Sequence, residues 1–448
     1  MLDLFVIGAG PGGYEAAAHA AKLGKKVALA EKQYLGGVCL NVGCIPTKTY
    51  LRSARLLSEC RLGAAFALEV SDARLNMPAL VERKDRVVGT LVKGVDTLLK
   101  RAGVEVVRGR ARIVSPNAVE VDGKRWETAN ILIATGSRPA VPPIAGIDSD
   151  GVLDSNTVFN LQHIPARIAI IGGGYIGLEF ASFFAAAGAE VVVFEMLPQV
   201  ASGCDRDIAD RLGRELKRQG IDIRTSVKVT SIEGKTLRFT SPDGAEGAFE
   251  ADCILNATGR QPNVEDLGLE QLGVDFDRKG IRTSDRGKTN VPGVWACGDV
   301  TGRRLLAHAA TREGIVAVNN MFGRPDRLRY ETIPSVIYTH PEVASVGWTE
   351  QELEAKGIPY KKSQVPMAYS GRFIIDNPQG TGIVKVLVGA KYGELLGVHV
   401  LGDSSSEFIV AAAAMMEMEL SASEVAAIVF PHPTVSEALK EAILRAAE

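Results

Sequence analysis

The sequence predicts an α/β protein that consists of two Rossmann-like nucleotide-binding domains and a C-terminal α+β domain. Three observations predict this class: a repeated glycine-rich turn, a turn-rich β segment after each copy, and alternating apolar patterns in the last third of the chain. The chain has 448 residues, too long for one compact core when a domain takes roughly 100–200 residues. The last third is predicted to contain strands near 332–348, 382–389 and 394–401 and a helix at 405–419.

An internal repeat defines the two nucleotide-binding domains. Residues 3–31 superpose without gaps on residues 167–195, and each copy contains an apolar strand, a GxGxxG turn, an alanine-rich helix and a second strand. The first glycine makes the turn, the second lets the backbone approach a pyrophosphate, and the third lets the helix pack on the strand. A closing acid can accept hydrogen bonds from ribose hydroxyls. These residues are Gly8, Gly10, Gly13 and Glu31 in the first copy and Gly172, Gly174, Gly177 and Glu195 in the second.

A second, shorter repeat supports two separate dinucleotide sites. The triplet Ala-Thr-Gly at 134–136 recurs at 257–259, and each copy follows an alternating, turn-rich β segment, at 104–126 and 221–252. Each half of this region therefore predicts a nucleotide-binding unit that contains an inserted β piece. We expect the chain to bind two dinucleotides.

Two cysteines five positions apart mark the candidate redox centre. Cys39 and Cys44 lie in the glycine-rich run 36–48, shortly after the first nucleotide-binding repeat. A dithiol held beside a bound cofactor can release two electrons as a disulfide forms and accept them again. Zinc binding would need two further Cys or His ligands, and no second close pair exists in the sequence, so no metal site is predicted. The remaining cysteines are interpreted as ordinary small residues: Cys60, Cys204, Cys253 and Cys297.

Charge and hydropathy argue against several functional classes. The formal net charge is −2 and no Lys/Arg stripe occurs, so neither a nucleic-acid nor a membrane partner is predicted. Residues 1–7 are typical of a strand and not of a secretion signal. The apolar run 168–194 contains Glu179 and Glu190 within a strand–turn–helix–strand pattern, which favours a buried core over a membrane span. We expect a cytoplasmic protein.

The ordered set of motifs resembles the dihydrolipoamide dehydrogenase family, one of the class I pyridine nucleotide-disulfide oxidoreductases. The matching segments are CLNVGCIPTK at 39–48, both GxGxxG turns, both ATG triplets, CGD at 297–299 and HPTVSE at 432–437. The resemblance runs in order from about residue 3 to about residue 445, without large insertions. Each motif alone is suggestive, and the ordered set is highly specific.

The resemblance implies FAD in the first nucleotide site and a pyridine nucleotide in the second. Lys48, paired with Glu179, would lie beside the flavin, and Asp299 would bind the ribityl chain. In the second site Gly259 would contact NAD, and Glu195 favours a free ribose 2′-hydroxyl over a 2′-phosphate, so NAD is predicted over NADP. The resemblance adds further FAD contacts at Ala111, Thr135, Gly136, Leu306, Ala307 and His308.

The same resemblance assigns roles in the redox chemistry. Cys39 would exchange with the substrate, and Cys44 would face the flavin. His432, oriented by Glu437, would act as the base, because a histidine held by a carboxylate has a suitable pKa and a fixed tautomer. In this family the histidine reaches the disulfide of the other subunit, so the resemblance implies a homodimer.

The predicted division of the chain follows from these assignments. Residues 1–145 together with 265–330 are expected to form the FAD-binding domain, 146–264 the NAD-binding domain and 331–448 the dimerisation domain. The predicted reaction is the oxidation of protein-bound dihydrolipoamide to lipoamide, with reduction of NAD through the redox disulfide and FAD. The lipoyl group would be carried by a partner protein of a 2-oxoacid dehydrogenase or glycine-cleavage system.

Two alternatives stay open at the level of the sequence. The chain could be an NAD(P)H-dependent reductase of another small disulfide, or a non-catalytic flavoprotein that senses redox state. Ala309 stands where the family commonly has lysine, and Phe430-Pro431 replaces the usual pair before His432. These departures bear on which substrate is bound more than on the class of reaction.

Overall fold

Two parallel sheets that share the order of four equivalent strands form the nucleotide-binding part of the molecule. The computed structural model describes residues 1–448, and its first sheet has the strand order β20–β7–β1–β2–β3. The second sheet has the order β9–β16–β10–β11–β12, and in both sheets neighbouring strands are parallel. The strands are β1 (Leu4–Ile7), β2 (Val27–Glu31), β3 (Glu105–Arg108), β7 (Ile131–Ile133) and β20 (Val294–Ala296), and β9 (Val152–Asp154), β10 (Arg167–Ile171), β11 (Glu190–Phe194), β12 (Ile221–Arg224) and β16 (Cys253–Asn256).

The repeat in the sequence therefore corresponds to a repeat in structure. The central strands β1 and β10 are almost entirely apolar and buried, as expected where both faces of a parallel sheet are covered. Helices α1 (Pro11–Lys22) and α5 (Tyr175–Ala186) each begin directly after a glycine turn. Each unit also carries a three-stranded antiparallel sheet: β4 (Ala111–Ser115), β5 (Ala118–Val121) and β6 (Lys124–Glu127), and β13 (Lys228–Glu233), β14 (Thr236–Thr240) and β15 (Glu246–Glu250).

The C-terminal region forms an antiparallel sheet packed against helices. Its order is β21–β22–β25–β24–β23, and α11 (Ser405–Glu417) and α13 (Glu437–Ala447) share its apolar core. The α/β fold class is confirmed: the two parallel sheets and this five-stranded antiparallel sheet each pack against helices. The strands are β21 (Ser335–Ile337), β22 (Val343–Gly347), β23 (Tyr360–Pro366), β24 (Ile383–Gly389) and β25 (Leu395–Leu401).

Three details of the C-terminal region differ from the prediction. The strand expected at 332–348 is two strands, because the chain reverses at 338–342, around Pro341, to pair β21 with β22 in antiparallel register. The sequence does not predict strand β23, because a polar residue, Ser363, occupies a buried position and breaks the alternation of apolar and polar residues. The helix predicted at 405–419 ends at Glu417, and Met418 beyond it is 73% exposed, whereas Met415 and Met416 pack in the core.

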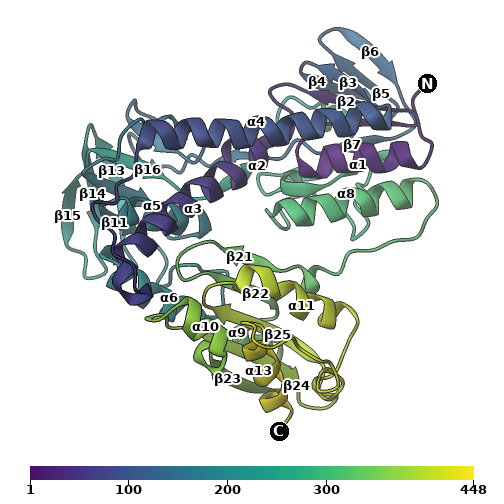
Figure 1. Ribbon diagram of the computed structural model, residues 1–448. Helices are drawn as coiled ribbons and strands as arrows, with labels where there is room; N and C mark the ends of the chain where they lie inside the picture. The colour runs from purple at the N-terminus through teal and green to yellow at the C-terminus, as the bar shows by residue number, and fades with distance from the viewer.

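Two long helices connect the parts of the molecule. Figure 1 shows α4 (Met77–Ala102) crossing from the first parallel sheet towards the second, with α3 (Cys44–Arg61) beside it. On α3, Tyr50 packs with its ring centroid 5.0 Å from that of Phe183 on α5. A single apolar core contains both residues and also Ile337 of the C-terminal sheet. The position of α3 is therefore set jointly by the second parallel sheet and the C-terminal region.

The remaining elements are short or connect these layers. None of the helices is both long enough and apolar enough to cross a membrane. The strands are β8 (Ser137–Pro139), β17 (Arg260–Pro262), β18 (Phe276–Asp277) and β19 (Gly280–Ile281), and the helices are α2 (Gly37–Val42), α6 (Arg206–Arg218), α7 (Leu269–Leu272), α8 (Ala307–Met321), α9 (Glu350–Lys356), α10 (Gly371–Asp376) and α12 (Ala422–Val425).

The glycine turn of the second unit gives a stability prediction. A methyl group on Gly177 would overlap the carbonyl oxygen of Gly172, whereas one on Gly174 would meet no atom within 4 Å. We expect Gly177→Ala to lower the free energy of unfolding by about 1–3 kcal/mol, because helix and strand must move apart. Gly174→Ala is the matched control and should change it by less than about 0.5 kcal/mol. Urea denaturation measures both, and equal midpoints for the two variants would contradict the steric argument.

Candidate active site

The two predicted redox cysteines lie on either side of a break between helices. Cys39 belongs to α2, and Cys44 is the first residue of α3, with Gly43 between them. The side-chain amide of Asn41 donates to the carbonyl oxygens of Leu35 and Gly37, both at 2.9 Å, and holds this segment in place. Cys44 therefore starts a helix of 18 residues, a position at which the helix dipole stabilises a thiolate.

The interaction between the two thiols separates their pKa values. A hydrogen bond from Cys39, helped by the charge of Lys48, lowers the pKa of Cys44 to about 7 although burial opposes this. The same hydrogen bond, together with burial, raises the pKa of Cys39. The reduced pair therefore loses its first proton at Cys44 while Cys39 stays protonated.

Lys48 lies one helical turn after Cys44 and contacts Glu179 of α5. Its Nζ is 2.8 and 3.0 Å from the two carboxylate oxygens of Glu179, whose side chain is only 6% exposed. The backbone N–H of Tyr338 donates to the same carboxylate at 3.0 Å, and Lys48 Nζ lies 4.5 Å from the centre of the Tyr338 ring. Burial alone would lower the pKa of Lys48, but the bond to Glu179 raises it above its usual value, so the ammonium stays charged.

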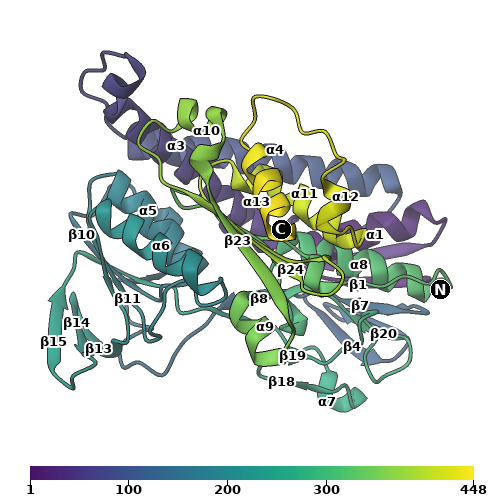
Figure 2. The same ribbon diagram turned by 90° about the horizontal axis from the view of Figure 1, so that it is seen from below.

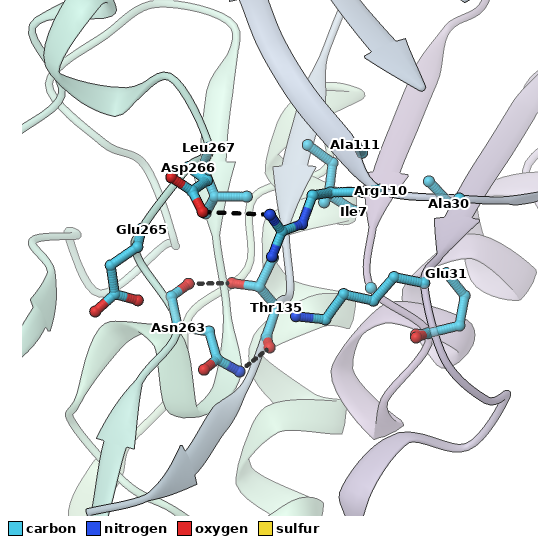
Figure 3. A pocket seen from close by; sticks show the side chains of 13 residues that line it. Ile7, Ala30, Glu31, Arg110, Ala111, Thr135, Asn263, Glu265, Asp266 and Leu267 are labelled. Atoms are coloured by element: carbon cyan, nitrogen blue, oxygen red, sulfur yellow. Dashed lines mark hydrogen bonds and ion pairs between the residues drawn. The ribbon is translucent and has the colours of Figure 1, made fainter. Parts of the chain in front are cut away.

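The first glycine turn borders a pocket that is lined by the predicted contacts Glu31 and Thr135. Figure 3 shows Glu31 on one side of this pocket and Thr135 with Asn263 on the other. The Glu31 carboxylate accepts the backbone N–H groups of Ala9 and Gln33, each at 2.8 Å. A methyl group on Gly10 would meet no protein atom within 4 Å, so the N-terminus of α1 faces open space. The predicted contacts Gly8 and Ala111 also line the pocket, and Gly136 follows Thr135 with a positive φ of 68°.

Asp299 is held by a chain of polar side chains that the sequence did not reveal. The hydroxyl of Ser137 donates to the Asp299 carboxylate at 2.5 Å, and Arg260 Nε donates to the same hydroxyl at 2.7 Å. Burial raises the pKa of Asp299, while Ser137 and Arg260 oppose that rise. Ser137 and Arg260 each directly follow one of the repeated ATG triplets, and the strands they begin, β8 and β17, pair with one another. The equivalent positions of Ser137 and Arg260 in the repeat are the sequence signal from which their contact could have been predicted.

The remaining predicted flavin contacts lie at the start of α8. Leu306 precedes the helix, Ala307 is its first residue and His308 its second. The Nε2 atom of His308 lies 2.7 Å from the carbonyl oxygen of Pro334, which ties this end of α8 to the C-terminal region. The buried carboxylate of Glu313 on the same helix accepts the backbone N–H of Gly298 at 2.6 Å and fixes the turn before Asp299.

The second glycine turn reproduces the geometry of the first. Glu195 accepts the backbone N–H groups of Gly173 at 2.6 Å and Leu197 at 2.7 Å, as Glu31 does with its neighbours. Methyl groups on Gly174 and Gly259 would meet no protein atom within 4 Å, so open space lies over this turn as well. Both turns therefore fit a dinucleotide with its ribose at the glutamate. No group of three or more His, Cys, Asp or Glu side chains is arranged to hold a metal ion.

His432 and Glu437 form a pair that is separate from the cysteines of the same chain. His432 Nδ1 lies 2.9 Å from Glu437 Oε1, and the other carboxylate oxygen accepts the N–H of Thr434 at 2.9 Å. Both hydrogen bonds lower the pKa of Glu437, and the bond from the Thr434 N–H has the larger effect. The His432 side chain is 79% exposed. Within one chain the structure thus brings together the predicted base and its orienting acid, but does not join them to Cys39.

Comparisons with known proteins agree with this arrangement. Residues 2–314 match the pyridine nucleotide-disulphide oxidoreductase family, and residues 333–443 match the dimerisation domain of that family. Dihydrolipoyl dehydrogenase 3 of Pseudomonas aeruginosa is 40% identical over 99% of this chain and 97% of its own length. The dihydrolipoyl dehydrogenase of Bacillus subtilis is 37% identical over 99% and 98% of the two chains.

Two solved structures are similar over the whole chain. The HOCl-induced flavoprotein disulfide reductase RclA from Escherichia coli has a TM-score of 0.87 at 30% identity, covering 99% of both chains. LpdA from Mycobacterium tuberculosis has a TM-score of 0.91 at 25% identity, also covering 99% of both chains. The predicted enzyme class and the cofactors FAD and NAD are those of this family. The chain belongs to the pyridine nucleotide-disulphide oxidoreductases.

Proposed function

We propose that this chain oxidises dihydrolipoamide, carried on a partner protein, and reduces NAD through a Cys39–Cys44 redox disulfide. The observation that carries the proposal is the pair itself: the thiol of Cys39 on α2 hydrogen-bonds with that of Cys44 at the start of α3, and the pKa of Cys44 is lowered to about 7. Relatives of nearly the same length that are dihydrolipoyl dehydrogenases support the choice of substrate. FAD, when bound at the first glycine turn, supplies the two-electron link between the dithiol and NAD.

The proposed thiol chemistry uses this chain's residues in two exchanges. A thiolate of dihydrolipoamide attacks the Cys39 sulfur, the Cys39–Cys44 bond breaks, and the proton of the substrate thiol passes to His432. The second substrate thiol then attacks the substrate sulfur of the mixed disulfide, the bond to Cys39 breaks, and Cys39 takes up the second proton. Lipoamide is released, so the substrate has lost two electrons and the cysteine pair has gained them. Cys44 leaves as the thiolate because its pKa is the lower of the pair.

Lys48 and Glu179 control the charge next to the Cys39–Cys44 pair. The Lys48 ammonium favours the thiolate of Cys44 and would stabilise negative charge on a reduced cofactor in the same place. Glu179 keeps Lys48 charged and fixes its direction through two hydrogen bonds. The polar chain from Arg260 through Ser137 would orient Asp299 towards the ribityl hydroxyls of FAD.

The active unit in this proposal is a homodimer in which His432 serves the cysteines of the other subunit. The match to the family's dimerisation domain and the exposure of His432 support it. The lipoyl-bearing partner would belong to a 2-oxoacid dehydrogenase or glycine-cleavage system. The domain boundaries at 145/146, 264/265 and 330/331 and the cytoplasmic location stay predictions.

A second candidate function is the reduction of another disulfide. The structural similarity to RclA, a flavoprotein disulfide reductase, favours it specifically. The deciding experiment measures NAD reduction by dihydrolipoamide with purified protein, with NADP as a parallel acceptor and with glutathione disulfide plus NADH as the reverse test. Turnover with dihydrolipoamide and NAD supports the proposal, whereas bound FAD with turnover only on another disulfide would contradict it.

The exchange mechanism predicts the effect of removing one sulfur. We expect Cys44→Ser to abolish NAD reduction by dihydrolipoamide, because no internal disulfide can form. FAD should stay bound, since the first glycine turn is untouched. Cys60→Ser, which changes a cysteine outside the pair, is the control and should retain wild-type turnover. Full lipoamide turnover by Cys44→Ser would rule out the scheme.

The lowered pKa of Cys44 predicts a titration. In the reduced protein one thiolate should appear as pH rises through about 7, well below the usual cysteine pKa of about 8.5. Below that pH Cys44 is protonated and its nucleophilicity is lost. Thiolate absorbance at 240 nm, measured as the difference from Cys44→Ser, follows the step. Lys48→Met should move the step to higher pH, and an unshifted step would contradict the role of Lys48.

The His432–Glu437 pair predicts a loss of base catalysis. We expect His432→Gln to lower kcat with dihydrolipoamide by about 10²–10⁴-fold, because the proton acceptor is removed. Glu437→Gln should have a smaller effect, since the histidine remains. Stopped-flow reduction of the oxidised enzyme isolates this step from NAD binding. Equal rates for wild type and His432→Gln would show that another group takes the proton.

A further inference from the structure

A lysine with no exposure to solvent lies between the second nucleotide-binding unit and the C-terminal region. Lys385, in the middle of β24, has a side-chain exposure of 0%. Its Nζ contacts three carboxylates: Asp205 at 2.8 and 3.0 Å, Asp207 at 2.8 Å and Glu350 at 2.6 Å. Burial by itself disfavours the ammonium, but these bonds raise its pKa above the usual value, so Lys385 stays charged.

The three carboxylates come from two parts of the chain: Asp205 and Asp207 from the second nucleotide-binding unit, and Glu350 from the C-terminal region. Asp205 is fully buried and caps α6, where it accepts the N–H of Asp207. Glu350 belongs to α9 of the C-terminal region, and its own backbone N–H donates to Asp205 at 3.1 Å. Figure 2 shows α6 on the side of the C-terminal sheet, next to α5. Lys385, which is itself a residue of the C-terminal sheet, therefore fixes the start of α6 to that sheet.

The segment held by Lys385 forms one wall of the second glycine turn. Between Glu195 and Asp205 the chain loops back, and the N–H of Ala201 donates to the carbonyl oxygen of Gly173 at 2.8 Å. The hydroxyl of Tyr175, the first residue of α5, lies 3.7 Å from the sulfur of Cys204. The end of this loop is thus pinned by Lys385, while its middle supports the turn that faces the dinucleotide.

We propose that Lys385 is a positioning residue for NAD binding, acting through Asp205 and the loop 195–205. This inference rests on the proposed assignment of NAD to the second glycine turn. A buried ion cluster has a directional geometry that apolar packing lacks, and it sets the distance between the loop and the C-terminal sheet. The direct contacts of NAD with Gly172, Gly174 and Glu195 would depend on that distance.

The test measures NAD affinity by isothermal titration calorimetry on the FAD-loaded protein, for wild type, Lys385→Met and Asp205→Asn. Lys362→Met is the matched control. Lys362 contacts the other oxygen of Glu350 at 2.7 Å but is half exposed and does not bind Asp205. We expect both test variants to weaken NAD binding on the order of tenfold, and the control to bind like wild type. The KM for NAD should rise, while kcat and the KM for dihydrolipoamide change little.

Asp205→Asn keeps the inference testable if Lys385→Met, which leaves the buried Asp205 without a counter-ion, does not fold. The asparagine oxygen can still cap α6 but carries no charge for Lys385. Wild-type NAD affinity in the folded variants would overturn the inference, as would an equal change in the KM values for both substrates. If wild-type protein itself failed to bind NAD, the proposed function would be wrong and this inference would fall with it.

Discussion

The ion pair between Lys48 and Glu179 is the contact on which the arrangement of the active site depends. It joins the redox helix α3 to α5 of the second nucleotide-binding unit, and Tyr338 of the C-terminal region donates to the same carboxylate. Glu179 is nearly buried, so loss of Lys48 would leave a carboxylate without its counter-ion. The pair therefore gives three parts of the chain one common geometry, and it places a fixed positive charge one helical turn from Cys44.

The two nucleotide-binding units show how one local design can serve two cofactors. In both, a glutamate at the end of the second strand accepts two backbone N–H groups, one of them from the glycine turn. The units differ in what completes each sheet: β20 comes from a later part of the chain, whereas β9 precedes the repeat. The chain thus leaves the first unit, builds the second, and returns. That return pairs β20 with β7 and brings Asp299 to Ser137.

The C-terminal region does more than present His432 and Glu437. Its residues share an apolar core with α3 and α5, its Pro334 contacts His308, and its Lys385 holds the start of α6. Segments next to both glycine turns are therefore held by contacts from the C-terminal region. A homodimer that pairs these regions would bring the base of one subunit to the redox centre of the other through a rigid scaffold. In the proposed reaction the substrate proton passes to His432, while the electron pair passes to the cysteines.

The sequence by itself determined the features that depend on short-range geometry. The glycine spacing, the closing acids, the Cys39–Cys44 pair and the repeated ATG triplets each occupy a few consecutive positions, and local backbone sterics leave them little choice of conformation. Only the tertiary structure decided which distant groups meet where no motif marks them: Arg260 with Ser137 and Asp299, and Lys385 with Asp205 and Glu350. The pairing of Lys48 with Glu179 is implied by the family resemblance, and the structure shows its geometry. Most of these partners lie more than a hundred residues apart. Their pairing follows from how the sheets pack against one another, for which no single stretch of sequence carries a local signal.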